Sequence, residues 1–259
     1  MDAQDKSERV TLVVKLSYNG RAYSGFAKQK DPNVHTIQGE LEHALATLFR
    51  HPVETVCAGR TDAGVHALDQ TVSVKLDVPE LSSREPRKIV TSLNALTPDD
   101  ISITGVGFAA SEFSARFDAV YRVYRYRIVM GGAPPLFTRE FAWWHRAPLN
   151  VAGMQQAAHL LEGEHDFKSF CKAASAEGKS TCRHVESIEF FEENVLGERC
   201  VTMQIVGNAF LHSMVRTIMG TLVQVGAGRR QPTWVQDVLD ARDRQAAGEN
   251  APARGLTFW

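Results

Sequence analysis

An arginine and an aspartate that could do chemistry stand two positions apart in the stretch Cys57-Ala58-Gly59-Arg60-Thr61-Asp62-Ala63-Gly64-Val65-His66. A guanidinium near a carboxylate lowers the pKa of the acid, whereas burial raises it. An aspartate that is kept ionised and away from water can act as a nucleophile or as a base. Arg60 and Asp62 could instead staple a tight turn, because structural ion pairs also perturb pKa values.

The elements around this stretch place it in a loop. Apolar runs with strand character precede it at residues 53–56 and follow it at residues 71–76. The sequence therefore predicts a loop from Gly59 to Asp69 between two strands. Loops on a rigid scaffold often carry binding and catalytic residues. Gly59 and Gly64 bracket the acid and permit backbone angles that other residues resist.

A second candidate region is the strand predicted over residues 121–130, in which aromatic residues and arginines alternate. The two-residue period places Arg122, Tyr124, Tyr126 and Ile128 on one face and Tyr121, Val123, Arg125 and Arg127 on the other. Tyrosines can stack on bases and arginines can neutralise phosphates, so the strand could contact RNA. It could equally be a half-buried strand whose tyrosines cover the edge of the core.

The stretch from Gly59 to His66 closely resembles the catalytic signature of the tRNA pseudouridine synthase I family, the TruA type. Further segments resemble that family in the same order, namely residues 113–119, Tyr-Arg-Tyr at 124–126, residues 165–170, residues 207–216 and residues 251–256. The resemblance extends over about residues 12–256. One departure is Phe26, which stands where the family usually has a tryptophan and keeps an aromatic face.

The resemblance implies an isomerase that converts uridine to pseudouridine in the anticodon arm of tRNA, at positions 38, 39 and 40, without a cofactor or a metal ion. It implies that Asp62 is catalytic, that Arg60 and Arg216 support the active site, and that Tyr124 and Leu256 bind the target base. It further implies a cytoplasmic homodimer whose partner is tRNA, with no part for a membrane or for DNA.

One aspartate is enough for such an isomerisation. Glycoside hydrolysis uses two carboxylates because one of them must activate water. An isomerisation uses no water, so a single acid in a closed pocket suffices. Asp62 would either attack C1′ of the ribose or remove a sugar proton to give a glycal, and the sequence leaves both routes open.

Other classes of protein are compatible with parts of the sequence. A non-catalytic RNA-binding protein that uses its sheet as a platform would account for Tyr124 and Tyr126 but not for the Asp62 loop. Ser169-Phe170-Cys171-Lys172 fits the S-x-x-K pattern of serine acyl-enzymes, but the accompanying S-D-N and K-T-G motifs are absent. A zinc site is also conceivable, although no standard spacing fits its candidate ligands Cys171, Cys182, His165 and His184.

The composition is that of an ordinary globular protein, with 259 residues, a formal net charge of −1 and 44% hydrophobic residues. No run approaches the roughly 18 apolar residues that span a bilayer, and the polar start resembles neither a secretory signal nor a transit peptide. The four cysteines form no C-x-x-C pair and are expected to be reduced. A near-neutral protein that binds RNA must concentrate its positive charge on one face or in one cleft.

The order of the predicted elements indicates an α+β protein of two similar split-βαβ halves, RRM-like or ferredoxin-like, at residues 1–115 and 116–259. The halves are expected to form a largely antiparallel mixed sheet with helices on one face and a central RNA-binding active-site cleft. Helices are predicted over residues 36–49, 83–96, 151–161 and 209–225, the last of them capped by Asn208. The charged segment 240–252 is predicted to be mobile.

Overall fold

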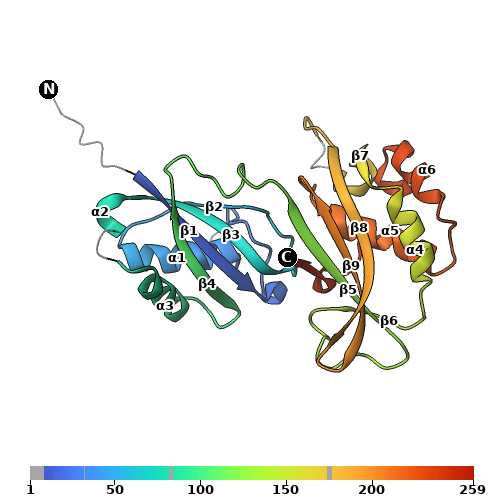
Figure 1. Ribbon diagram of the computed structural model, residues 1–259, viewed down its shortest axis with the longest axis horizontal. Coiled ribbons are helices and arrows are strands. Elements are labelled where there is room, and N and C mark those ends of the chain that lie inside the picture. The colour runs from blue at the N-terminus through green and yellow to red at the C-terminus, as the bar shows by residue number, and fades with distance from the viewer. Residues whose placement is uncertain (1–8, 32, 82–83, 174–176) are drawn as a thin grey trace. The chain divides into compact units, whose positions relative to one another are not determined.

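The computed structural model describes residues 9–31, 33–81, 84–173 and 177–259. The chain divides into two compact units, unit 1 (Met1–Ala119) and unit 2 (Val120–Trp259). Each unit has its own strands and helices (Figure 1). Within each unit the described strand pairs are antiparallel, apart from one parallel pair in unit 2. The predicted α+β class with a largely antiparallel sheet is confirmed. Within the described ranges no helix is long and apolar enough to cross a membrane.

Unit 1 is built on antiparallel strands. The order across the sheet is β4 (Ile101–Ala109), β1 (Arg9–Tyr18), β3 (His66–Asp77) and β2 (Thr55–Cys57). The helices are α1 (Ile37–Phe49), the single-turn α2 (Val78–Leu81) and α3 (Pro86–Leu96). Alternate side chains of β1 point into the core, where Leu12, Val14 and Leu16 are fully buried.

Helix α1 follows the prediction for residues 36–49 closely. Thr36 Oγ1 accepts a hydrogen bond from Gly39 N at 3.2 Å and so caps the first turn. The helix ends at Arg50, whose φ of 65° is left-handed. Its apolar stripe, spaced at helical intervals, is buried and consists of Ile37, Leu41, Ala44 and Leu45.

Unit 2 is built on a second set of strands. The order is β10 (Leu256–Phe258), β5 (Arg122–Met130), β9 (Glu198–Gly207), β8 (Cys182–Val195) and β7 (Gly163–Asp166), and β6 (Trp143–His145) runs parallel to β5. The helices α4 (Val151–His159), α5 (Met214–Gly226) and α6 (Trp234–Ala241) lie together on one side of these strands (Figure 1). Helix α5 is central, because eleven of its 13 residues are buried.

Some boundaries differ from the sequence-based predictions. Strand β3 begins at His66, so the loop that carries Asp62 ends before the predicted Asp69. Helix α5 begins at Met214, and Asn208 does not cap it. Asn208 instead pairs with β8: its Oδ1 accepts from His184 N at 3.1 Å, and its own N donates to His184 O at 3.0 Å.

Helix α3 begins later than the predicted residue 83. Its first residue is Pro86, whose missing N–H is not needed in a first turn. Ser83 itself lies outside the described residues.

The segment 240–252, which its composition predicts to be mobile, is packed along α5. Gly248 N donates to Thr221 Oγ1 at 3.0 Å. A Cβ on Gly220 would stand 1.7 Å from Glu249 O, so the two backbones touch. The prediction is wrong because close backbone approach between glycines and a distant segment is not visible in composition.

Candidate active site

Asp62 lies in the loop of residues 58–65, which joins β2 to β3 in unit 1. Its side chain is half-buried, whereas Arg60 in the same loop is exposed. The backbone turns just after the acid, where Val65 N donates to Asp62 O at 3.1 Å and Gly64 takes a φ of 76°. A left-handed residue at this point favours glycine, so the local sequence suits the turn.

The buried amide of Gln70 holds the start of this loop from β3. Gly59 N donates to Gln70 Oε1 at 3.3 Å, and Gln70 Nε2 donates to Gly59 O at 2.6 Å. The side chain therefore satisfies both backbone groups of one residue, as a neighbouring strand would. No motif marks Gln70 in the sequence, and the available signal is its spacing: it precedes Val72 by two positions and therefore belongs to the inward face of the strand.

The hydroxyl of Tyr18 reaches the same loop from the end of β1. Its oxygen lies 2.8 Å from Thr61 Oγ1 and accepts a hydrogen bond from Gln70 Nε2 at 3.5 Å. Burial raises the pKa of Tyr18 well above its ordinary value, and the hydrogen bonds to Thr61 and Gln70 offset only part of the rise. The phenol therefore stays protonated and can donate to Thr61 while it accepts from Gln70.

The segment that follows β1 braces the loop as well. Phe26 N donates to Thr61 O at 3.0 Å, and Gly64 N donates to Tyr23 O at 3.2 Å. Gly25 lies between the two contacts with a φ of 106°, and a Cβ there would stand 2.9 Å from Thr61 O. This close approach in a left-handed conformation requires glycine.

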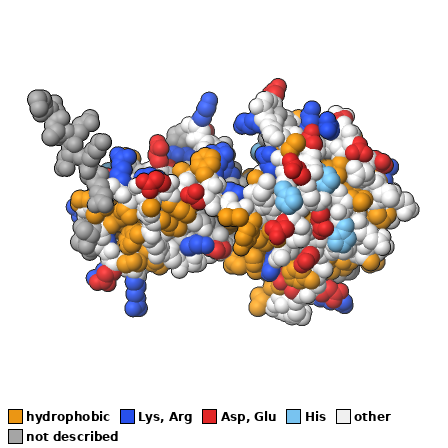
Figure 2. Space-filling view, turned by 45° about the horizontal axis from the view of Figure 1, so that its top comes forward, with side chains coloured by type: hydrophobic (Ala, Val, Ile, Leu, Met, Phe, Trp, Pro, Cys, Tyr) orange, Lys and Arg blue, Asp and Glu red, His pale blue; other side chains and the backbone are white. Residues whose placement is uncertain are grey.

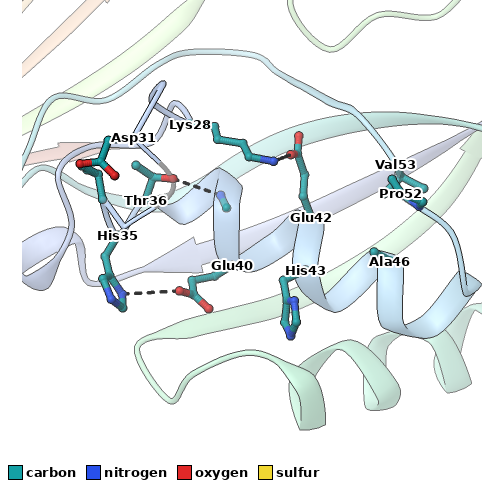
Figure 3. A pocket seen from close by; sticks show the side chains of 12 residues that line it. Lys28, Asp31, His35, Thr36, Glu40, Glu42, His43, Ala46, Pro52 and Val53 are labelled. Atoms are coloured by element: carbon teal, nitrogen blue, oxygen red, sulfur yellow. Dashed lines mark hydrogen bonds and ion pairs between the residues drawn. The ribbon is translucent and has the colours of Figure 1, made fainter.

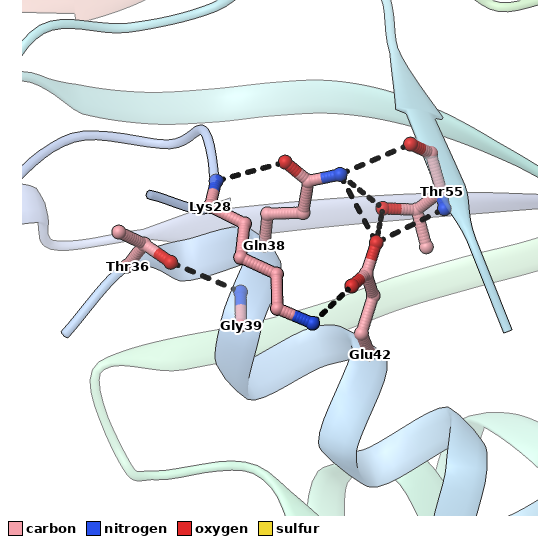
Figure 4. Close-up of polar contacts among 6 residues, drawn as sticks. All are labelled: Lys28, Thr36, Gln38, Gly39, Glu42 and Thr55. Carbon is pink, nitrogen blue, oxygen red and sulfur yellow. Dashed lines mark hydrogen bonds and ion pairs between the residues drawn. The ribbon is translucent and has the colours of Figure 1, made fainter. Parts of the chain in front are cut away.

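Polar side chains of α1 hydrogen-bond to the two segments that contact the loop, namely strand β2 and the segment that follows β1 (Figure 4). Glu42 Oε1 accepts from Thr55 N at 3.1 Å and from Thr55 Oγ1 at 3.0 Å, which holds the first residue of β2. Lys28 N donates to Gln38 Oε1 at 2.9 Å, and Lys28 Nζ donates to Glu42 Oε2 at 3.2 Å. The strand that enters the loop and the segment that braces it are thus tied to one helix.

A pocket of about 520 Å³ lies beside α1 (Figure 3). Its lining mixes acids, histidines and a lysine, and two pairs form among them: His35 Nδ1 lies 3.6 Å from Glu40 Oε1, and Lys28 Nζ lies 3.2 Å from Glu42 Oε2. None of the five predicted site residues lines this pocket. Its paired charges indicate no particular ligand.

In unit 2, Tyr124 and Leu256 lie on adjacent strands. The pairing of β10 with β5 sets Phe258 opposite Tyr124 and Leu256 opposite Tyr126. The Tyr124 ring makes edge-to-face contacts with Phe210 and Phe258, at centroid distances of 5.2 and 5.1 Å. Both Tyr124 and Leu256 are buried. The short strand β10 therefore holds Leu256 in place beside an aromatic cluster.

Arg216 lies on α5 and binds the chain just before β10. Arg216 Nε donates to Ala251 O at 2.8 Å, and Ala251 N donates to Arg216 O at 3.0 Å. The next carbonyl, Pro252 O, accepts from the Tyr126 hydroxyl at 2.7 Å. Burial raises the pKa of Tyr126, so its phenol remains a donor. A continuous path of contacts thus links the three predicted residues of unit 2.

Arg125 and Arg127 of β5 lie on the opposite face from its tyrosines and are paired within the protein, whereas Arg122 shares the face of the tyrosines and donates to Asn208 O at 2.5 Å. The Arg125 guanidinium stacks 3.8 Å from the centre of a Trp259 ring, and Arg127 Nε lies 2.6 Å from Glu193 Oε1. Burial alone would raise the pKa of Glu193, but hydrogen bonds from Thr202 and Arg127 outweigh it and lower the pKa. On the face drawn in Figure 2, acidic and basic side chains of unit 2 are interspersed.

The residues of the other chemical hypotheses are placed differently. Ser169 is fully buried, and its Oγ accepts a hydrogen bond from Asp243 N at 2.9 Å, which leaves it no access to a substrate. Cys171 is buried, whereas Cys182 is exposed. Among the residues that the structure describes, no three His, Cys, Asp or Glu side chains gather as metal ligands would.

A family model described as tRNA pseudouridine synthase matches residues 16–118 and 157–259. A tRNA pseudouridine synthase A from Brevibacillus brevis is 42% identical over 94% of this chain and 96% of that protein. The protein of the same name from Bacillus subtilis is 39% identical over 96% of this chain and 97% of its own length. Among solved structures, a Cbf5-Nop10-Gar1 complex matches with a TM-score of 0.34 and 12% identity, over 82% of this chain and 54% of that one, which is too little to bear on the fold.

The family match covers most of both units and includes the Asp62 loop of unit 1 and the Arg216 and Leu256 segments of unit 2. The matches to these two relatives, at 39% and 42% identity, cover nearly the whole chain. This chain therefore belongs to the tRNA pseudouridine synthase family.

Proposed function

We propose that this protein isomerises uridine to pseudouridine in the anticodon arm of tRNA, at positions 38, 39 and 40, with Asp62 as the catalytic residue. The observation that carries the proposal is a half-buried acid on a loop that hydrogen bonds hold from β1, from β3 and from the segment after β1. Such a brace is what an acid needs if it must meet one atom of a bound nucleotide. Membership of the tRNA pseudouridine synthase family supplies the reaction.

The reaction conserves every atom of the nucleotide apart from exchanged protons. The N1–C1′ bond breaks, the uracil turns, and a C5–C1′ bond forms; C5 then loses its proton and N1 gains one. Asp62 either attacks C1′ and is displaced by C5, or removes a sugar proton and returns it. Water at C1′ would release the base instead, so a site walled by apolar and aromatic side chains favours isomerisation.

The remaining predicted residues receive roles from the same chemistry. The target base must leave its stack, which costs a few kcal/mol, and Arg60 is exposed and suited to enter the vacated space. Tyr124 and Leu256 would hold the extruded uracil. Arg216 would support this region through its bond to Ala251.

The substitution Asp62→Asn tests the proposal, with tritium release from tRNA labelled at uridine C5 as the assay. Release should fall to background while tRNA affinity changes little, because an amide neither attacks C1′ nor takes up a proton. Asp69→Asn is the matched control: Asp69 forms an exposed ion pair with Lys15 at 2.8 Å, and such pairs contribute about 0–1 kcal/mol. Undiminished release by Asp62→Asn would refute the proposal.

A non-catalytic RNA-binding platform is less well supported. Tyr126 is fully buried and Tyr124 nearly so, and Arg127 is paired with Glu193. Strand β5 therefore has few free groups for bases or phosphates, and the brace around Asp62 would have no purpose. Tight tRNA binding by the wild-type protein without any tritium release would favour this alternative.

We also propose that the protein is a homodimer that acts on tRNA in the cytoplasm. Leu136 and Phe137 are 73% and 60% exposed, and Leu196 is 74% exposed. The carboxylate of Glu198 accepts hydrogen bonds from the backbone N of Leu136, Phe137 and Thr138, which fixes the loop in this exposed state. Exposed apolar side chains on a fixed loop suit an interface. Sedimentation should give twice the chain mass for the wild type and the monomer mass for Phe137→Asp.

The strand orders support a common plan for the two halves, residues 1–115 and 116–259. Unit 1 has the order β4–β1–β3–β2, and unit 2 has β10–β5–β9–β8 at its centre. In both, the first strand of the unit lies between its last strand and a later one, as in a split βαβ arrangement. We infer that the first half carries the acid and the second half carries the base pocket.

A further inference from the structure

Two polar side chains of the unit 1 core, Gln70 and Tyr18, end at the loop that carries Asp62. We propose that they are positioning residues, which fix Gly59 and Thr61 so that the carboxylate of Asp62 keeps one orientation toward the ribose. This inference rests on the proposed function, because it concerns the same site.

Neither polar group can turn to water for a partner. Gln70 is 0% exposed and Tyr18 is 4% exposed. A buried amide or hydroxyl without a hydrogen bond is costly, so the loop is favoured only in the conformation that supplies these bonds. A leucine and a phenylalanine would fill the same space without imposing any such condition on the loop.

The bonds act on Gly59 and Thr61, two residues shortly before the acid. Gln70 binds both the N and the O of Gly59, and Tyr18 binds the side chain of Thr61. Gln70 also donates to Tyr18 at 3.5 Å, which joins the two contacts into one network. The chain is therefore held at the residue next to Asp62 and again two residues earlier.

The location of the network indicates a task beyond stability. The other inward residues farther along β3 are apolar, and Val72, Val74 and Leu76 are buried. Polar core side chains appear on this face where the strand meets the loop. Their cost is thus confined to the place where orientation matters for the reaction.

A double-mutant cycle tests the Tyr18 contact. Tyr18→Phe and Thr61→Val each remove one hydroxyl, and each should slow the single-turnover rate of tritium release about tenfold without changing the Kd for tRNA. Thr61→Ser keeps the hydroxyl and should restore the rate. The double mutant should be no slower than Tyr18→Phe, because that change already breaks the bond that Thr61→Val removes. Additive losses, or single mutants with the wild-type rate, would overturn the proposal.

The substitution Gln70→Met tests the second contact, since it keeps the length of the side chain and removes its hydrogen bonds to Gly59 and to Tyr18. We expect about a hundredfold slower single turnover with an unchanged Kd, as for a misplaced catalytic group. Thr97→Val is the matched control, because Thr97 is a buried residue of unit 1 whose hydroxyl donates to Leu93 O at 3.0 Å. It should lower Tm as the other variants do but leave the rate unchanged.

The outcomes distinguish a failure of the proposed function from a failure of the positioning role. Absence of tritium release from the wild-type protein would overturn both the proposed function and the positioning role. If the wild type releases tritium and Gln70→Met releases it at the same rate, the positioning role alone is overturned. The same holds if Thr97→Val loses as much rate as Tyr18→Phe.

Discussion

Hydrogen bonds hold two irregular stretches, the Asp62 loop of unit 1 and the 248–252 segment of unit 2, but the backbone of the second is in addition packed against the helix α5. Side-chain groups of Gln70 and Tyr18 bind the Asp62 loop through hydrogen bonds. The unit 2 segment also forms hydrogen bonds, with Arg216, Thr221 and Tyr126. In addition, its backbone lies directly against that of α5, because Gly220 and Gly248 leave the space. Hydrogen bonds have direction, whereas packing mainly defines a shape.

This difference suits the two proposed tasks. A carboxylate that must meet one atom of a ribose needs a fixed orientation, and a pocket for a uracil needs a fixed shape. Changes in unit 1 should therefore affect the rate of the chemical step most. Changes in unit 2 should affect stability and substrate binding most.

The largest loss of stability is expected from Gly220→Ala, which disrupts the packing of residues 248–252 on α5. Its Cβ would stand 1.7 Å from Glu249 O, so the segment must leave α5. We expect a loss of about 3 kcal/mol in the free energy of unfolding, even though alanine favours a helix by about 1 kcal/mol. Urea denaturation measures it. Gly105→Ala, whose Cβ would meet nothing within 4 Å, is the control, and equal stability of the two variants would contradict the packing argument.

The corresponding change in the hydrogen-bonded region is Gly25→Ala. A φ of 106° and a Cβ 2.9 Å from Thr61 O both oppose alanine, which should cost about 1–3 kcal/mol. Turnover should also slow, because the alanine pushes on the residue next to Asp62. Gly131→Ala has a φ of 136° but no atom within 4 Å, so it should share the strain and keep the turnover. Equal turnover in the two variants would remove the link between this contact and the acid.

The substitution Tyr126→Phe sharpens the comparison between the two units. It removes the bond from the hydroxyl to Pro252 O at 2.7 Å, at a cost of about 1 kcal/mol. Because this bond holds the chain that leads to Leu256, KM for tRNA should rise more than kcat falls. A slower single turnover with an unchanged KM would instead place Tyr126 in the same class as Tyr18.

The smallest effect concerns the loop of residues 136–138, which the carboxylate of Glu198 holds through hydrogen bonds. The hydroxyl of Thr138, with the backbone N–H groups of residues 136–138, lowers the pKa of Glu198 from its ordinary 4.5 to about 2. The folded state therefore favours the carboxylate, so this contribution is present above pH 4.5 and is lost as the pH falls toward 2. Glu198→Gln should lower Tm at pH 7, and the gap in Tm should close between pH 4.5 and 2. A gap that does not depend on pH would show that charge is not the cause.

Local patterns were enough to predict several elements. Helix α1 follows from its cap at Thr36 and its apolar spacing, and the position of Asp62 in a loop between strands follows from the apolar runs on either side. The first residue of α5 and the packing of residues 240–252 against this helix could not be predicted in this way. Asn208 pairs with His184 and does not cap a helix. Gly220 contacts the backbone of Glu249, which is distant from it in the sequence.

The sequence by itself determined which residues could carry the chemistry, because a short motif brings an acid, an arginine and two glycines together through adjacency alone. Only the tertiary structure decided what holds them. Tyr18 meets Thr61 across 43 positions, and Gln70 meets Gly59 across 11. Hydrogen bonds and packing act between groups that folding brings together, so the orientation of the acid depends on contacts that no local pattern contains.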